Sequence, residues 1–104
     1  GIDIPAPRGT PVVATQNGIV IQVVKSNSGY GNLVRLQHDG GVQSLYAHLS
    51  VIGVRRSQQV LRGEVIGWVG STGKSTGPHL HFGLSQNGQS FDPEPFWFDR
   101  ENGR

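Results

Sequence analysis

The sequence predicts an all-β domain, arranged as an open antiparallel sheet or β-sandwich of short strands. Three observations support this fold class. The 104 residues include 16 glycines and 6 prolines, a composition that leaves little room for long helices. The apolar residues fall in short, β-branched runs, and no segment repeats with the period of a helix. Turn-forming residues separate these runs, and the length fits one domain with a modest core.

The first half of the chain is expected to supply four strands. Two valine-rich runs, at 12–13 and 19–24, flank Asn17-Gly18, the strongest short signal for a β-hairpin, and predict strand, turn and strand. The segment 33–38 alternates apolar and polar residues, as a half-buried strand does. A glycine-rich turn then leads into a returning strand over 42–49.

The second half continues the same pattern. A short strand at 64–70 is punctuated by glycine and is followed by a polar loop at 71–77. A further strand is predicted over 78–86, and Asn87-Gly88 marks a second hairpin-type turn. The aromatic segment 96–98 is expected to pack against the edge of the domain.

Charge and composition exclude several classes of function. The formal net charge is +2, and the nine lysines and arginines are scattered without aromatic platforms, which argues against a nucleic-acid binder. No apolar run approaches the roughly 20 residues needed to cross a bilayer, and the chain has no cysteine for a disulfide. Because it opens in mid-pattern at Gly1, we expect a domain of a longer protein. The mildly basic surface suits an anionic matrix such as a bacterial cell wall.

Two histidines one residue apart are the first candidates for chemistry. On a strand, residues i and i+2 share a face, so His79 and His81 project together while Leu80 and Phe82 face the core. Two imidazoles on one face can share a metal ion or a water molecule.

Three further residues bear on the same site. Strand alternation places His48 on the face of Tyr46, whereas His38 precedes a turn and is expected to be a solvated edge residue. Asp3 lies between two isoleucines and is expected to face away from the core. An aspartate, a close histidine pair and a further histidine would suit zinc, since no thiolate is available.

Two other functional motifs, the serine-nucleophile motif and the phosphate-binding loop, are absent from the sequence. No G-x-S-x-G nucleophile motif occurs. The run "GSTGKSTG" at 70–77 resembles a phosphate-binding loop, but only two residues separate Gly70 from Gly73, and Pro78 leads into a strand rather than a helix.

Several phrases together resemble the LytM/lysostaphin-type zinc metallopeptidases, which cut peptidoglycan cross-bridges. The phrases, which follow the family's order and spacing from Gly1 to about Pro93, are "GIDIPAPRGTPVVATQNGIV", "GYGNLVRLQHDGG", "LYAHLS", "VLRGEVIGWVGSTGKSTGPHLHFGL" and "DP". The combination of "STGPHLHF" with "YAHLS" is the most specific part. The strand-and-turn phrases also resemble those of biotinyl/lipoyl hairpin folds.

The resemblance implies a role for each site residue. Asp3 and His81 correspond to zinc ligands, and His48 and His79 to the histidines that act on the catalytic water and the transition state. One Zn²⁺ per domain would lower the pKa of its bound water toward about 7 and polarise the scissile carbonyl. The sequence does not assign which histidine is the general base.

One feature departs from the family pattern. The family's site begins with a histidine four residues before the aspartate, as H-x-x-x-D, and that position lies upstream of Gly1. Residues 1–104 are therefore expected to form a LytM-type domain without its N-terminal strand and first zinc-ligand segment. The third protein ligand, and an upstream domain or prodomain, are expected in the preceding sequence.

Three functions follow as hypotheses. The first is a zinc-dependent endopeptidase that hydrolyses amide bonds in peptidoglycan stem peptides or cross-bridges. It is favoured because four site residues are retained, and it would act outside the cytoplasm of bacteria or be phage-associated. The second is a non-catalytic LytM-type module that binds the cell wall and activates a separate amidase. The third is a lipoyl-like carrier, although neither Lys25 nor Lys74 occupies a hairpin-tip phrase.

Overall fold

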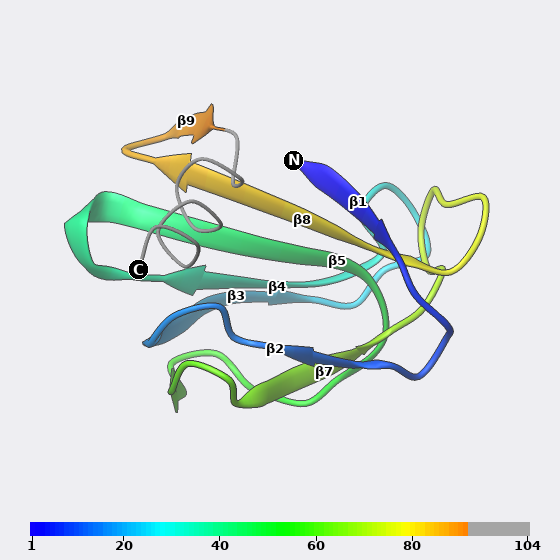
Figure 1. Cartoon of the computed structure of the whole chain (residues 1–104), viewed down its shortest axis with the longest axis horizontal. Coiled ribbons are helices and arrows are strands. Elements are labelled where there is room, and N and C mark those ends of the chain that lie inside the picture. The colour runs from blue at the N-terminus through cyan, green and yellow to red at the C-terminus, as the bar shows by residue number, and fades with distance from the viewer. Residues whose placement is uncertain (92–104) are drawn as a thin grey trace, which may run out of the picture.

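A computed structural model describes residues 1–91, and the aromatic segment 96–98 lies outside the described residues. The chain is built from strands joined by short turns (Figure 1). The elements are β1 (Ile2–Pro5), β2 (Pro11–Val13), β3 (Gly18–Val24), β4 (Asn32–Gln37), the 3-10 turn η1 (Asp39–Gly41), β5 (Val42–Ile52), β6 (Gln59–Val60), β7 (Val65–Val69), β8 (His79–Gln86) and β9 (Gln89–Phe91). No helix of the described part is long and apolar enough to cross a membrane.

The strands form one antiparallel sheet that folds over on itself. Its main path runs β1-β8-β5-β4-β3-β6, and β9 pairs with the end of β8. β5 spans 11 residues and joins the two parts of the sheet. Its first half lies between β4 and β8, while residues 49–52 pair with β7, which in turn pairs with β2. The open antiparallel all-β architecture predicted from the sequence is confirmed.

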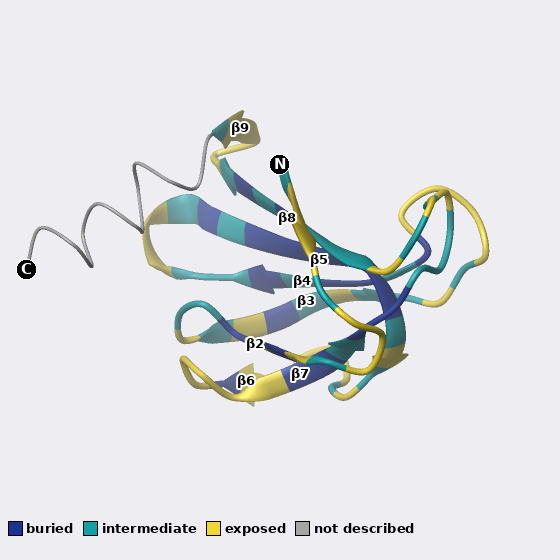
Figure 2. Cartoon of the chain, turned by 45° about the vertical axis from the view of Figure 1, so that its right-hand side comes forward, coloured by how far each residue is buried: buried dark blue, intermediate teal, exposed yellow. Residues whose placement is uncertain are grey.

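The core lies between the main sheet and the β2–β7 arm (Figure 2). Alternate residues of the strands point into it, as the pleat of a half-buried strand requires. Tyr46 is the largest fully buried side chain, and its hydroxyl lies 2.7 Å from that of Thr15. Phe82 packs against the Tyr46 ring with centroids 5.4 Å apart. A smaller cluster of Leu33, Leu45 and Ala47 covers part of the opposite face.

One of the two hairpin predictions is confirmed and the other is wrong. Asn87 and Gly88, with φ angles of 50° and 86°, connect the paired strands β8 and β9. By contrast, β2 pairs with β7, and β3 pairs with β4 and β6, so Asn17-Gly18 does not close a hairpin. The Asn17 side chain instead accepts a hydrogen bond of 2.7 Å from the Arg62 main chain. This contact holds a corner at which the chain passes between the two parts of the sheet.

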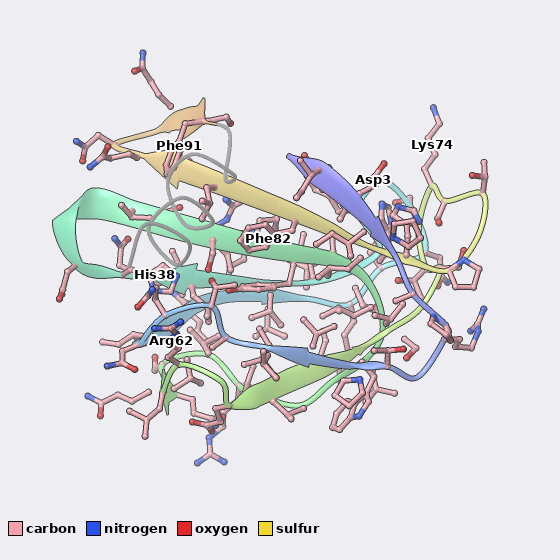
Figure 3. The ribbon with its side chains drawn as sticks, in the orientation of Figure 1. Asp3, His38, Arg62, Lys74, Phe82 and Phe91 are labelled. Atoms are coloured by element: carbon pink, nitrogen blue, oxygen red, sulfur yellow. The ribbon has the colours of Figure 1, made fainter. Side chains whose placement is uncertain are left out.

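His38 is also placed differently from the expectation of a solvated edge residue. Its Nδ1 lies 2.7 Å from the Asn17 carbonyl oxygen, to which it donates, and its Nε2 lies 2.7 Å from the hydroxyl of buried Ser44, from which it accepts. The ring therefore bridges β4, β5 and the corner before β3. It lies far from Asp3, toward the other end of the sheet (Figure 3).

Candidate active site

The adjacent strands β1, β8 and β5 bring the predicted site residues together. Asp3 pairs with His81, and His81 pairs with Ala47, so these residues form one rung across the three strands. His79 lies two positions before His81 on the same face. Phe82 joins the core and Leu80 packs against it, which confirms the orientation predicted for this strand.

The position of His48 depends on an irregularity in β5, which simple strand alternation does not predict. Tyr46 points into the core, so strict alternation along β5 would bury His48 beside it. β5 instead carries irregularities here: its registers with β4 and β7 both shift, and His48 adopts a left-handed backbone with φ of 62°. The bulge turns the imidazole to the opposite face, where its ring centroid lies 4.9 Å from that of His79. The expectation that His48 shares a face with Tyr46 is therefore wrong.

Main-chain carbonyls orient both of these histidine rings. His48 Nδ1 lies 2.7 Å from the Thr72 carbonyl oxygen, and His79 Nδ1 lies 2.8 Å from the Gly77 carbonyl oxygen. A carbonyl only accepts, so each Nδ1 carries the hydrogen and donates it. In the neutral ring the lone pair is then on Nε2. The fold therefore presents two imidazoles that, when neutral, carry their lone pairs on Nε2.

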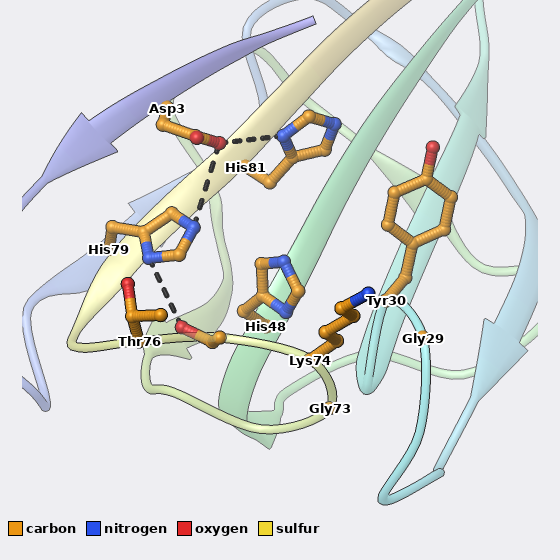
Figure 4. Close-up of a pocket in the computed structure, with 10 residues that line it drawn as sticks. Asp3, Gly29, Tyr30, His48, Gly73, Lys74, Thr76, His79 and His81 are labelled. Atoms are coloured by element: carbon orange, nitrogen blue, oxygen red, sulfur yellow. Dashed lines mark hydrogen bonds and ion pairs between the residues drawn. The ribbon is translucent and has the colours of Figure 1, made fainter.

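Asp3 and His81 form the closest charged contact of the site (Figure 4). Asp3 Oδ1 accepts a hydrogen bond of 2.7 Å from His81 Nδ1 and lies 3.5 Å from His79 Nε2. The hydrogen bond from His81 lowers the pKa of Asp3, against the opposing effect of desolvation, so the carboxylate stays ionised near neutral pH.

This pair offers the donor atoms that suit a metal ion. A carboxylate oxygen and an imidazole nitrogen directed at one another are ligands that zinc accepts. Within residues 1–91, no group of three or more histidine, cysteine, aspartate or glutamate side chains is arranged to hold a metal ion. The described residues thus fit two of the three protein ligands that a catalytic zinc site normally has.

The four residues line one open pocket of about 680 Å³. The lining consists of Asp3, Gly29, Tyr30, His48, Gly73, Lys74, Ser75, Thr76, His79 and His81. The wall opposite β1 comes from parts of two loops, 25–31 after β3 and 70–78 after β7: Gly29 and Tyr30 from the first and residues 73–76 from the second. The ring of Tyr30 stacks on His81 at a centroid distance of 5.4 Å.

The two wall loops are held together at their backbones. Gly31 and Gly73 have φ angles of 65° and 72°, and a Cβ added at Gly73 would lie 2.3 Å from the Gly31 nitrogen. The Thr72 hydroxyl donates to the Leu49 carbonyl at 2.7 Å and accepts from the Asn32 main chain at 3.0 Å. Only glycine permits such a close approach with positive φ. The loop contact therefore fixes the Thr72 carbonyl that orients His48.

Sequence reasoning missed the residues of this wall. Tyr30, Thr72 and Lys74 were not among the predicted site residues, because they lie in polar, glycine-rich loops whose partners no local pattern indicates. The signal available was the glycine content of both loops, which indicates close backbone approach but not which segments meet.

This sheet, with an aspartate and three histidines facing one pocket, has the architecture of the LytM/lysostaphin-type peptidases. The chain belongs to Peptidase family M23, whose sequence profile matches residues 1–93. The family match overturns the hypothesis of a lipoyl-like carrier.

Named relatives support the same assignment. The DD-carboxypeptidase/endopeptidase Mpg of Neisseria meningitidis is 53% identical over 93 residues, covering 89% of this chain and 21% of the relative. Lysostaphin of Staphylococcus simulans is 42% identical over 101 residues, covering 92% of this chain and 20% of the relative. The chain thus spans about a fifth of the length of these curated relatives.

The solved structures agree with the sequence comparison. The catalytic domain of lysostaphin superimposes with a TM-score of 0.86 at 40% identity, covering 94% of this chain and 77% of that domain. A zinc containing peptidase from Vibrio cholerae gives a TM-score of 0.83 at 39% identity, covering 86% of this chain and 28% of that chain.

Proposed function

We propose that this chain is the catalytic domain of a zinc-dependent endopeptidase that hydrolyses amide bonds in peptidoglycan stem peptides or cross-bridges. The observation that carries the proposal is the pair His48 and His79, whose rings lie side by side with both Nδ1 atoms bound to main-chain carbonyls. Relatives named as endopeptidases, among them the peptidoglycan DD-endopeptidase ShyA of Vibrio cholerae, support the substrate class. The site of action would be outside the bacterial cytoplasm or on a phage particle.

Asp3 and His81 would hold the zinc ion, through a carboxylate oxygen and Nδ1. The third protein ligand would come from sequence preceding Gly1. This placement is supported by the position of Gly1 beside the His81 ring, where an added Cβ would lie 2.9 Å from His81 Nε2. When bound, zinc supplies a Lewis acid for the scissile carbonyl and lowers the pKa of a bound water.

The two remaining histidines handle protons at the reacting amide. One Nε2 accepts the proton of the attacking water, and the other stabilises the oxyanion or protonates the leaving amine. His48 is 6% exposed and His79 is held by Gly77, so neither ring needs to reorganise during the reaction. Such preorganisation is the contribution that the sheet makes to catalysis.

A second function is favoured by one observation. Within residues 1–91 no group of three or more potential metal ligands comes together, and a non-catalytic module that binds the wall and activates an amidase would need none. Against it, His48 and His79 are both oriented through Nδ1 by main-chain carbonyls, an arrangement that binding alone does not require.

The two functions are separated by the products formed from purified peptidoglycan. The natural protein that carries this chain is incubated alone with purified peptidoglycan, and the soluble products are analysed by mass spectrometry. An endopeptidase releases peptides with new amino and carboxyl termini and leaves the bond between glycan and stem peptide intact. Binding to the wall without new termini, together with stimulation of an added amidase, would support the non-catalytic module instead.

A further inference from the structure

A single unmatched cation lines the catalytic pocket. Lys74 is the one lysine or arginine among the ten lining residues. Its side chain is exposed, and within residues 1–91 no carboxylate forms an ion pair with its ammonium group. The other charged group of the pocket, Asp3, is engaged by His81 and His79.

The backbone fixes where this cation stands. The Lys74 main-chain N–H donates to the Gly29 carbonyl at 2.7 Å. The preceding residue, Gly73, packs against Gly31 so closely that no side chain fits between them. Lys74 therefore projects from a braced segment at the same end of the sheet as Asp3 (Figure 3), although its own side chain is free to move.

We propose that Lys74 recognises a carboxylate of the peptide substrate and makes the domain select acidic peptides over their amidated forms. This inference rests on the proposed function. The carboxylate is the negatively charged group of a peptide, whether at its C-terminus or on a side chain, and a lysine ammonium binds it by a charge-assisted hydrogen bond. Because an ammonium at the pocket has no protein partner, it gains this interaction without breaking another.

The position of Lys74 limits where the carboxylate lies. Lys74, His48 and His79 line the same pocket, so a carboxylate bound by Lys74 is close to the amide that the histidines act on.

The experiment compares two forms of one cross-linked peptide released from purified cell wall. One form keeps its carboxylates, and the other has them converted to carboxamides. Synthetic versions of the peptide, amidated only at the C-terminus or only on the side chain, identify which carboxylate Lys74 binds. Hydrolysis is measured for the natural protein and for Lys74→Gln, Lys74→Arg and Lys25→Gln. Lys25 is the other lysine, is exposed and lies outside the pocket, so its variant has the same charge change without the contact.

The natural protein is expected to cleave the acidic form with a kcat/KM about five- to tenfold above that of the amidated form. Lys74→Gln should lose this preference, because its kcat/KM should fall for the acidic form and not for the amidated form. Lys74→Arg and Lys25→Gln should retain the preference. The preference should weaken as salt concentration rises. Equal slowing of both forms by Lys74→Gln, or an unchanged preference, would overturn the proposal.

A binding measurement separates this inference from the proposed function. Calorimetric titration of the same two peptides into His48→Ala and into His48→Ala with Lys74→Gln requires no hydrolysis. Tighter binding of the acidic form that depends on Lys74 supports the inference, even if the natural protein cleaves neither peptide. Absence of cleavage would count against the proposed endopeptidase function and not against this inference. Equal binding of both forms would overturn the inference.

Discussion

His48 in β5 and His79 at the start of β8 have ring centroids 4.9 Å apart, and each donates its Nδ1–H to a main-chain carbonyl. The two rings reach this position for different reasons. His79 is placed by the regular alternation of β8, whereas His48 is placed by a bulge in β5. The two rings line one pocket, and we propose that they move protons while Asp3 and His81 hold the metal.

Replacing His48 by alanine is expected to abolish activity and leave zinc bound. The expected loss in kcat is about 10²- to 10⁴-fold, because a general acid or base contributes about that factor. Zinc content measured by mass spectrometry should stay near one ion per domain, since His48 does not contact Asp3 or His81 by a hydrogen bond. A variant that lost its zinc would show that His48 is a ligand and that the assigned roles are wrong.

Replacing His81 by alanine is expected to remove both zinc and activity. Its Nδ1, which contacts the Asp3 carboxylate in this structure, is one of the two ligand atoms that we propose for zinc among the described residues. The matched control is His38→Ala, because His38 lies outside the pocket and its ring bonds to Asn17 and Ser44. That control should keep zinc and specific activity while lowering the free energy of unfolding by about 1–3 kcal/mol, since the hydroxyl of buried Ser44 loses its hydrogen bond to the ring. Zinc retained by His81→Ala would contradict the assignment.

The histidines of the pocket also show what the sequence could and could not predict. The orientation of His79 and His81 followed from period-two alternation, which holds wherever a strand is regular. His48 could not be placed in the same way, since a bulge depends on pairing with two neighbouring strands that no local pattern reveals. Asn17-Gly18 failed for a related reason: its local preference for a hairpin was overridden by tertiary contacts with Arg62 and His38.

The wall of the pocket was beyond prediction from local patterns. Contacts between Gly31 and Gly73 join segments about 40 residues apart, and neither segment alone indicates its partner. The roles of Asp3 and His81 were predicted from the family resemblance, and the structure brings the two side chains into contact. Their binding of zinc stays a prediction.

Gly73→Ala is expected to destabilise the domain and reduce its activity. The added methyl group would meet the Gly31 backbone at 2.3 Å, and the φ of 72° disfavours any side chain. A cost of about 1–3 kcal/mol in the free energy of unfolding follows, measured by urea denaturation. The control is Gly77→Ala in the same loop, where an added Cβ has no neighbour within 4 Å. Equal stability of the two variants would contradict the account of the loop contact.

Alkaline pH is expected to destabilise the domain through Tyr46. Burial raises the pKa of the Tyr46 hydroxyl above its ordinary value of 10.0. Above about pH 10 the unfolded chain releases this proton while the folded chain retains it, so stability falls as pH rises and is unaffected below. Tyr46→Phe should lack this part of the decline, and at neutral pH it should lose about 1 kcal/mol with the Thr15 contact. Parallel stability curves for the two proteins above pH 10 would contradict the prediction.

The central claim is that zinc, held in part by Asp3 and His81, is required for peptidoglycan hydrolysis. The most direct measurement is the rate of peptide release from purified cell wall by the natural protein before chelation, after complete removal of zinc, and during titration with zinc. Activity is expected to disappear with the metal and to return in proportion to zinc, up to one ion per domain. Peptide release that continues at its full rate after all zinc has been removed would contradict it.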